Sequence, residues 1–223
     1  MVTLFGNLES GNVHKVQLVL YWREIKYRRV DVSQSRGEPR RAEYLKINPI
    51  GKVPSVMFED GDVLTESGAI LYYFSQGTNL WPGDRRAQAE VLRWMFFEQY
   101  SHEPALAVMR YLIHFSDGPE RSRQRLEELW PRAHSALMVM ENQLDVWKFI
   151  AAETLTIADY ALYPYTAWAH EAGVDLEKYP SIRRWLRQVE SEPRFLPLMK
   201  DGAEQTLSFA DYFATSARAG VQA

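Results

Sequence analysis

Apolar and polar residues alternate in short blocks over the first third of the chain, and each block predicts one element. Residues 2–5 and 27–32 have the pattern of strands, and residues 13–22 between them carry apolar side chains at helical spacing. Residues 34–41 are polar and contain glycine and proline, which predicts a surface loop. A short helix is expected next, at residues 42–47.

Two further strands and a helix are predicted after residue 53. Asp60 and Gly61 lie between two apolar runs and predict a two-residue hairpin. Pro54 cannot donate to a strand ladder, so it should stand at an edge or at a strand start. Ser67 precedes apolar residues at helical spacing and is expected to cap a helix. The resulting order is strand, helix, strand, helix, strand, strand, helix, which predicts a thioredoxin-like domain at residues 1–77.

The pattern changes at residues 78–86, where glycine, proline and mixed charges predict a linker. Apolar residues then recur at helical spacing through residues 87–115 and 121–147. Pro104 is expected to kink the first of these helices, and Pro131 to bend the second.

The last third of the chain continues the helical pattern. Thr156 and Asp159 have the spacing of a capping box ahead of an apolar run, and residues 181–191 form a last regular helix in the pattern. We therefore expect an all-helical domain at residues 87–205 and a tail at residues 206–223.

Composition excludes several classes of function. The net charge of −3 makes nucleic acid or an anionic membrane an unexpected partner. The chain has no cysteine, which excludes disulfides, thiolate metal sites and a cysteine nucleophile. The five histidines contain no pair three or four residues apart, so we expect no metal. No apolar run approaches the roughly 20 residues of a membrane helix, and no signal segment opens the chain, so a cytoplasmic protein is expected.

One stretch combines features that suit a zwitterionic peptide ligand. A helix that starts at Ser67 presents unpaired N–H groups, which favour a carboxylate. The adjacent Glu66 can bind an ammonium group, and the backbone before Pro54 can pair with an extended ligand. Taken singly, Ser67 is expected as a helix cap and Pro54 as a strand boundary.

Three motifs of this stretch resemble the glutathione-binding half of the cytosolic glutathione transferases. They are N-P-x-G-K-V-P, the D-G hairpin and L-T-E-S-x-A-I-L-x-Y, and the resemblance covers most of the chain. The T-I-A-D sequence resembles the family's buried capping box, so Asp159 is expected to be structural. The resemblance implies a thioredoxin-like domain followed by an all-α domain, glutathione as co-substrate, and a homodimer.

The chemistry is expected in the loop after the first strand. Glutathione transfer needs the thiolate of the tripeptide, whereas a free thiol ionises above neutral pH. A donor aimed at the sulfur favours the ionised form. Ser10 resembles the donor of the serine-type families, and Asn12 resembles the donor of the bacterial nu class. Both residue types also cap helices, and the two could share the role.

The resemblance assigns the other glutathione contacts position by position. Lys52 and Arg40 would approach carboxylates of the tripeptide. Val53 would offer its N–H and C=O to the cysteinyl part of the tripeptide, which requires a cis bond between Val53 and Pro54. Pro39 departs from the family, because this position is often histidine. The assigned residues are Arg40, Lys52, Val53, Pro54, Glu66 and Ser67.

The electrophile is expected at the aromatic cluster of residues 96–103. Core packing is the alternative explanation of these aromatics, but in the family this helix helps to bind the second substrate. The resemblance therefore points to Tyr100, His102 and Tyr111.

The sequence is interpreted as a glutathione transferase. A glutathione-dependent peroxidase or disulfide reductase of the nu type remains an alternative, and so does a non-catalytic binding module. The maleylacetoacetate-isomerase type is disfavoured, because its S-S-C-x-x-x-R signature is absent.

Overall fold

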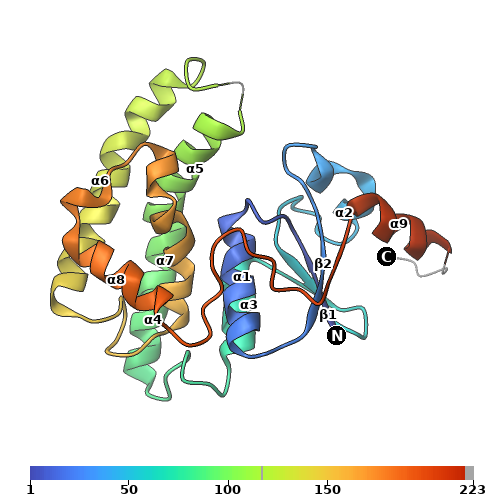
Figure 1. Ribbon diagram of the computed structural model, residues 1–223, viewed down its shortest axis with the longest axis horizontal. Coiled ribbons are helices and arrows are strands. Elements are labelled where there is room, and N and C mark those ends of the chain that lie inside the picture. The colour runs from blue at the N-terminus through green and yellow to red at the C-terminus, as the bar shows by residue number, and fades with distance from the viewer. Residues whose placement is uncertain (117, 219–223) are drawn as a thin grey trace. The chain divides into compact units, whose positions relative to one another are not determined.

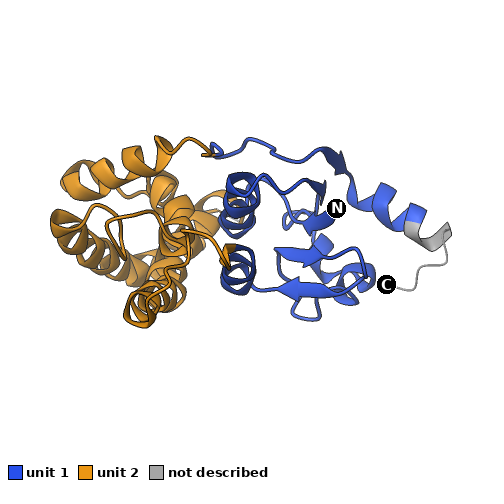
Figure 2. Cartoon of the chain, turned by 90° about the horizontal axis from the view of Figure 1, so that it is seen from below, with its two compact units in different colours: residues 1–74, 196–223 blue, residues 75–195 orange. Residues whose placement is uncertain are grey.

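The chain folds into two compact units, which Figure 2 distinguishes by colour. The computed structural model describes residues 1–116 and 118–218. Within the described chain, unit 1 consists of Met1–Phe74 together with Leu196–Arg218, and unit 2 is Ser75–Phe195. Unit 1 is therefore built from both ends of the sequence.

Unit 1 contains a mixed sheet, which in the described chain has five strands in the order β4-β3-β1-β2-β5. β1 and β2 are parallel, whereas β3 runs antiparallel to both β1 and β4. β5 pairs in parallel with the outer edge of β2, with Arg29 opposite Thr206. The strands are β1 (Val2–Phe5), β2 (Tyr27–Val30), β3 (Ser55–Met57), β4 (Val63–Thr65) and β5 (Gln205–Leu207).

Helices cover both faces of this sheet (Figure 1). On one face lie α1 (Gly11–Trp22) and α3 (Ser67–Ser75), and on the other α2 (Ala42–Leu45) and α9 (Phe209–Arg218), with the 3₁₀ turn η1 (Glu38–Arg40) ahead of α2. Phe5 of β1 contacts the rings of both Tyr44 in α2 and Tyr212 in α9. The fold is thus the predicted thioredoxin-like arrangement, completed by C-terminal elements.

The C-terminal boundary is a correction to the sequence analysis. Residues 196–205 were expected in the helical domain and residues 206–223 in a tail, but the described part of this region belongs to unit 1 and forms β5 and α9. Strand β5 has no local partner in the sequence, since it pairs with residues that lie 177 positions earlier.

The predicted two-residue hairpin is also wrong in detail. Phe58 N–H donates to the Asp62 carbonyl at 2.8 Å, and Gly61 N–H donates to the Phe58 carbonyl at 3.1 Å. Gly61 has a φ of 92°, in the left-handed region. The connection is therefore a three-residue loop with glycine at its last position, a geometry that a side chain would strain.

Unit 2 is helical. The long helix predicted at residues 87–115 is divided by one turn of π-helix just before Pro104, which lies in the first turn of the next helix. The main helices are α4 (Arg85–Phe97), η2 (Glu98–His102), α5 (Glu103–His114), α6 (Arg123–Val146), α7 (Ile157–Ala167) and α8 (Pro180–Glu190), with 3₁₀ turns η3 (Ala169–Ala172) and η4 (Leu176–Lys178). No helix in the described ranges is long and apolar enough to span a membrane.

The capping box of α7 is confirmed. The buried Asp159 carboxylate accepts hydrogen bonds from the backbone of Thr156 at 2.9 Å and of Ile150 at 2.8 Å, and from Trp185 Nε1 at 2.8 Å. The Thr156 hydroxyl donates to it as well, at 3.0 Å. Asp159 therefore ties the start of α7 to α8 and to the loop before α7, which is a structural role.

Candidate functional site

The N-termini of α1 and α3 are joined by a side-chain contact in unit 1. α1 begins after its cap Ser10, α3 begins at Ser67, and the Ser67 hydroxyl donates to Asn12 Oδ1 at 3.3 Å. Both helix starts carry a partial positive charge, which favours an anion. The structure thus brings together three residues that the sequence analysis had taken from two separate motifs.

Ser10 is buried and in an extended conformation, and its Oγ accepts from Val13 N–H at 3.4 Å. A hydroxyl group has one donor and two acceptor positions, so a cap that accepts from the helix can still donate its own proton. The Ser10 N–H donates to the Asn7 carbonyl at 3.4 Å, which closes the loop between β1 and α1.

The loop before β3 is fixed through one carbonyl group. The Lys52 carbonyl accepts from Asn48 Nδ2 and from the Tyr44 hydroxyl, both at 2.8 Å. Burial raises the pKa of Tyr44 to about 12, so the phenol stays protonated and can donate. The Val53–Pro54 bond in this loop is cis, which is the geometry that the resemblance required.

One cationic side chain, Lys52, lies on this loop, and a second, Arg40, lies beside it. Lys52 is exposed, and Arg40 donates to the Ile50 carbonyl at 3.2 Å. Gly51 has a φ of 65°, and a Cβ there would lie 2.9 Å from the Pro39 carbonyl oxygen. The close approach of the Arg40 turn to the loop therefore depends on glycine.

Glu66 immediately precedes α3 and has a φ of 67°, which is unusual for a residue with a side chain. Its carbonyl accepts from Ile70 N–H at 2.9 Å, and its side chain is exposed. Strained backbone of this kind concentrates at functional sites. A carboxylate is thus held at the start of α3, next to Ser67.

One supporting pair was missed by the sequence analysis, namely Tyr44 and Asn48. Asn48 belongs to the N-P-x-G-K-V-P motif, and an asparagine ahead of proline is a turn signal that could have indicated its role. Tyr44 gave no comparable signal, because its bond to Lys52 depends on how α2 packs.

The predicted electrophile residues belong to unit 2, and one of them needs revision. Tyr100 and Tyr111 are 84% and 50% exposed, whereas His102 is fully buried. The Thr166 hydroxyl donates to the Leu162 carbonyl, so it accepts from His102 Nε2, at 2.9 Å. His102 is therefore part of the interior of unit 2 and does not present a side chain to a substrate, while Tyr100 and Tyr111 remain predictions.

His14 adds no charge to this site. Burial lowers the pKa of His14, in α1, to about 3, so its imidazole is neutral at physiological pH and supplies no charge for an anion. Within the described residues, no group of three or more His, Asp or Glu side chains is arranged to hold a metal ion.

A thioredoxin-like unit with paired helix starts and a helical unit together define a two-domain class of protein. The family model of the glutathione S-transferase N-terminal domain matches residues 1–76, and that of the C-terminal domain matches residues 96–193. The chain belongs to the glutathione S-transferase family.

Individual relatives agree with this assignment. A crystal structure of a glutathione S-transferase from Pseudomonas fluorescens is 39% identical, with a TM-score of 0.87 over 89% of this chain and 99% of that one. A glutathione transferase from Burkholderia graminis, solved with two glutathione molecules per subunit, is 26% identical, with a TM-score of 0.76 over 86% and 85% of the two chains. The disulfide-bond oxidoreductase YfcG of Escherichia coli is 29% identical over 82% of this chain and 88% of its own.

Proposed function

We propose that this protein is a glutathione transferase, in which the thiolate of bound glutathione attacks a small electrophile. The observation that carries the proposal is the contact between Ser67 and Asn12, which joins two helix N-termini beside the buried Ser10. Helix starts and polar donors around one point favour a thiolate over a thiol.

The peptide part of glutathione fits the charges around this point. Its α-ammonium group would pair with Glu66, and its carboxylates would take the N–H groups at the start of α3 and the cations Lys52 and Arg40. The cysteinyl backbone would pair with Val53 as an added strand. These contacts would hold the sulfur near Ser10 and Asn12.

The protein would supply positioning and thiolate stabilisation, and it forms no covalent bond itself. In the reaction, the sulfur uses a lone pair to form a bond to the electrophilic carbon, and the leaving group departs with its electron pair. Tyr100 and Tyr111 are the proposed contacts of the electrophile.

Disulfide reduction is the second candidate, and the 29% identity to a disulfide-bond oxidoreductase favours it. Glutathione thiolate would attack one sulfur of the substrate and release the other as a thiolate. Because this chain has no cysteine, a second glutathione thiolate must then attack the glutathione sulfur of the mixed disulfide. This step forms glutathione disulfide and releases the remaining substrate sulfur as a thiolate. The relative with two glutathione molecules per subunit makes that stoichiometry reasonable.

A substrate panel with two variants separates the candidates. Wild type, Ser10→Ala and Asn12→Ala are assayed with electrophiles, peroxides and mixed disulfides. If Ser10 is the main donor, Ser10→Ala loses about ten- to hundredfold in transfer rate, because a hydrogen bond to a charged group contributes roughly 1.5–3 kcal/mol. If Asn12 is the main donor, the ranking reverses and disulfide reduction falls with it. A wild type that binds glutathione but turns over no substrate contradicts both and favours a binding module.

A further inference from the structure

The chain from residue 196 to residue 207, named here the return segment, packs against the elements that carry the proposed sulfur donors. The His14 ring of α1 hydrogen-bonds the backbone of Leu196, and β5 extends the sheet beside β2. α1 is the helix whose N-terminus bears Ser10. The return segment therefore contacts this helix within its first turns.

A second contact joins the return segment to α1 through β2. The Tyr27 hydroxyl accepts from Gln17 Nε2 of α1 at 3.1 Å and hydrogen-bonds the backbone of Gly202. A Cβ at Gly202 would lie 3.0 Å from the Tyr27 hydroxyl, so the segment approaches Tyr27 closely because residue 202 is glycine.

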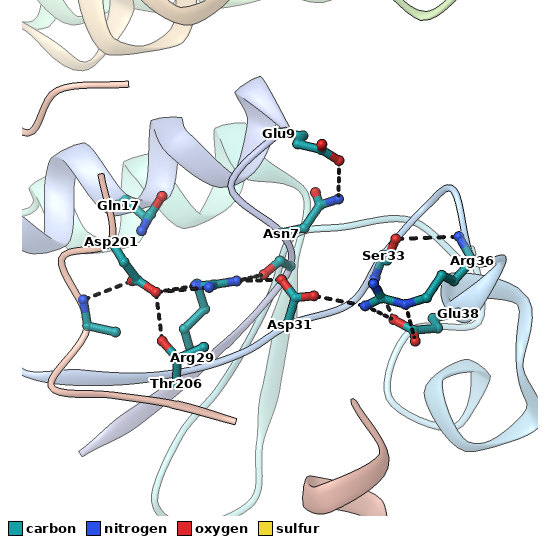
Figure 3. A network of polar contacts seen from close by, with 12 residues as sticks. Asn7, Glu9, Gln17, Arg29, Asp31, Ser33, Arg36, Glu38, Asp201 and Thr206 are labelled. Atoms are coloured by element: carbon teal, nitrogen blue, oxygen red, sulfur yellow. Dashed lines mark hydrogen bonds and ion pairs between the residues drawn. The ribbon is translucent and has the colours of Figure 1, made fainter. Parts of the chain in front are cut away.

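The strongest contact is made by Arg29, which is buried in β2 (Figure 3). Its Nε and Nη2 each lie 2.9 Å from Asp201 Oδ2 in the return segment. Its Nη1 donates at 2.8 Å both to the Gly6 carbonyl and to Asp31 Oδ1. A buried guanidinium needs such partners, because an uncompensated charge in the interior is strongly destabilising.

Asp201 is itself held by its own segment. Its Oδ2 accepts from the Thr206 hydroxyl at 2.6 Å, and its Oδ1 accepts from Ala203 N–H at 3.1 Å. Thr206 belongs to β5, so the sheet fixes where this carboxylate lies. The path from β5 to Gly6 thus consists of charge-assisted hydrogen bonds, which are among the strongest available.

Gly6 opens the loop that leads to Ser10. Its N–H donates to the Val30 carbonyl at 3.0 Å, and its carbonyl accepts from Arg29, so both polar groups of Gly6 are anchored on β2. Asn7 follows, and its carbonyl accepts from Ser10 N–H. A displacement at Gly6 would therefore move Ser10.

We propose that Asp201 is a positioning residue for the thiolate donor: acting through Arg29, it fixes the Gly6 carbonyl and with it the loop of residues 6–10. The catalytic part of this inference rests on the proposed function, whereas the positioning of the loop does not. A misplaced catalytic group can cost about 10²-fold in rate, so a small shift of this loop is sufficient to be measured.

The same network has a second arm that serves as an internal comparison. Asp31 Oδ2 accepts from Arg36 Nη2 at 2.9 Å, and Arg36 Nε donates to Glu38 Oε1 at 2.8 Å (Figure 3). Arg36 is exposed and contacts Asp31 on the oxygen that does not face Arg29. Arg36→Gln therefore removes two ion pairs of the network, with Asp31 and with Glu38, and leaves the bond to Gly6 in place.

The test uses the full chain with Asp201→Asn and Arg29→Lys as the perturbing variants. Asp201→Asn keeps the size of the side chain and removes its charge, and it carries the test if Arg29→Lys does not fold. Glu204→Gln is the matched control in the same segment. The contact described for the Glu204 side chain is an exposed ion pair with Lys26 at 3.8 Å, which lies outside the network around Arg29.

Three biophysical readouts are combined with a measurement of kcat/KM. Hydrogen–deuterium exchange of ligand-free protein reports on residues 6–13, with residues 55–57 of β3 as the internal reference. The ultraviolet absorbance of bound thiolate, titrated with pH, gives the pKa of bound glutathione, and calorimetry gives its Kd.

In Asp201→Asn we expect faster exchange at residues 6–13, a pKa of bound glutathione about one unit higher, and about tenfold lower kcat/KM at neutral pH. The Kd should stay within about twofold, because the peptide contacts are untouched. Arg36→Gln and Glu204→Gln should match wild type in exchange at residues 6–13 and in the pKa.

Unchanged exchange at residues 6–13 in Asp201→Asn overturns the inference, and so does faster exchange without a change in the pKa of bound glutathione. A wild type that does not bind glutathione overturns the proposed function instead. In that case the exchange comparison still decides whether Asp201 positions the loop.

Discussion

The left-handed conformation of Glu66 predicts that glycine will be more stable than alanine at this position. A residue with a side chain is destabilised by roughly 1–2 kcal/mol in the left-handed region, whereas glycine is not. Glycine also lowers the stability of the folded state by about 0.5–1 kcal/mol relative to alanine, because the unfolded chain is more flexible at a glycine. Glu66→Gly should therefore exceed Glu66→Ala in stability by about 0.5–1 kcal/mol, which corresponds to about 1–4 °C in Tm for a chain of this length.

The binding effect of the two variants should be the same. Both remove the carboxylate that is proposed to pair with the ammonium group of glutathione, at a cost on the order of 1–3 kcal/mol, or about fivefold to over a hundredfold in Kd. Ser67→Ala removes the bond to Asn12 and should weaken binding by a similar amount. Thermal unfolding and calorimetry on the same samples separate the backbone effect from the charge effect.

Ala69 supplies the control for the stability comparison. It is exposed in α3, where Ala69→Gly should destabilise by about 1 kcal/mol, the opposite direction from residue 66. If alanine is at least as stable as glycine at residue 66, the strained conformation is refuted. If both variants bind glutathione like wild type, Glu66 is not part of the site.

Three further predictions concern stability, pH and assembly. Asp159→Ala leaves four buried donors without their acceptor and should lower the free energy of unfolding, measured in urea, by at least about 3 kcal/mol. A decrease of less than about 1 kcal/mol would contradict the structural role of Asp159. Partial burial raises the pKa of Asp201, but the hydrogen bonds from Thr206 and Ala203 and the charge of Arg29 outweigh it and hold this pKa below its ordinary value of 3.8. The resulting stabilisation of the fold is complete above pH 3.8 and is lost as the pH falls through the folded pKa. The stability difference between wild type and Asp201→Asn should therefore be constant near neutrality and shrink in acid, and a difference that grows in acid would refute the sign. We expect a C2 homodimer with contacts that include Phe58 and residues 92–96, and light scattering that gives a mass of 25.9 kDa at micromolar concentration would exclude it.

Local signals explain what the sequence predicted well. The start of α3 at Ser67 and the capping box of α7 are encoded by residues three or four apart, so neighbouring positions were sufficient to predict them. The cluster of Ser10, Asn12 and Ser67 also followed from the motifs, although their contact did not.

The return segment could not be predicted, because its partners are distant in sequence. Strand β5 is three residues long and mostly exposed, so it carries no alternation of apolar and polar side chains. Arg29 gave no signal either. Its role depends on Asp201, which lies 172 positions later and meets it only after β5 has paired with β2.

His102 was misplaced for a geometric reason. The prediction took Tyr100 and His102 together from the family resemblance, although the two residues are only two positions apart. Two positions correspond to about 200° around an α-helix, so these two side chains point in nearly opposite directions. Tyr100 therefore faces outward while His102 faces the interior.

The pKa of glutathione bound to the wild-type protein tests the central claim most directly. The claim is that the starts of α1 and α3, with Ser10 and Asn12, favour the thiolate. Titration of the thiolate absorbance should give a value at least about one unit below the ordinary thiol value of about 8.5. Bound glutathione that ionises like the free thiol, in a complex that calorimetry shows to be saturated, would contradict the account.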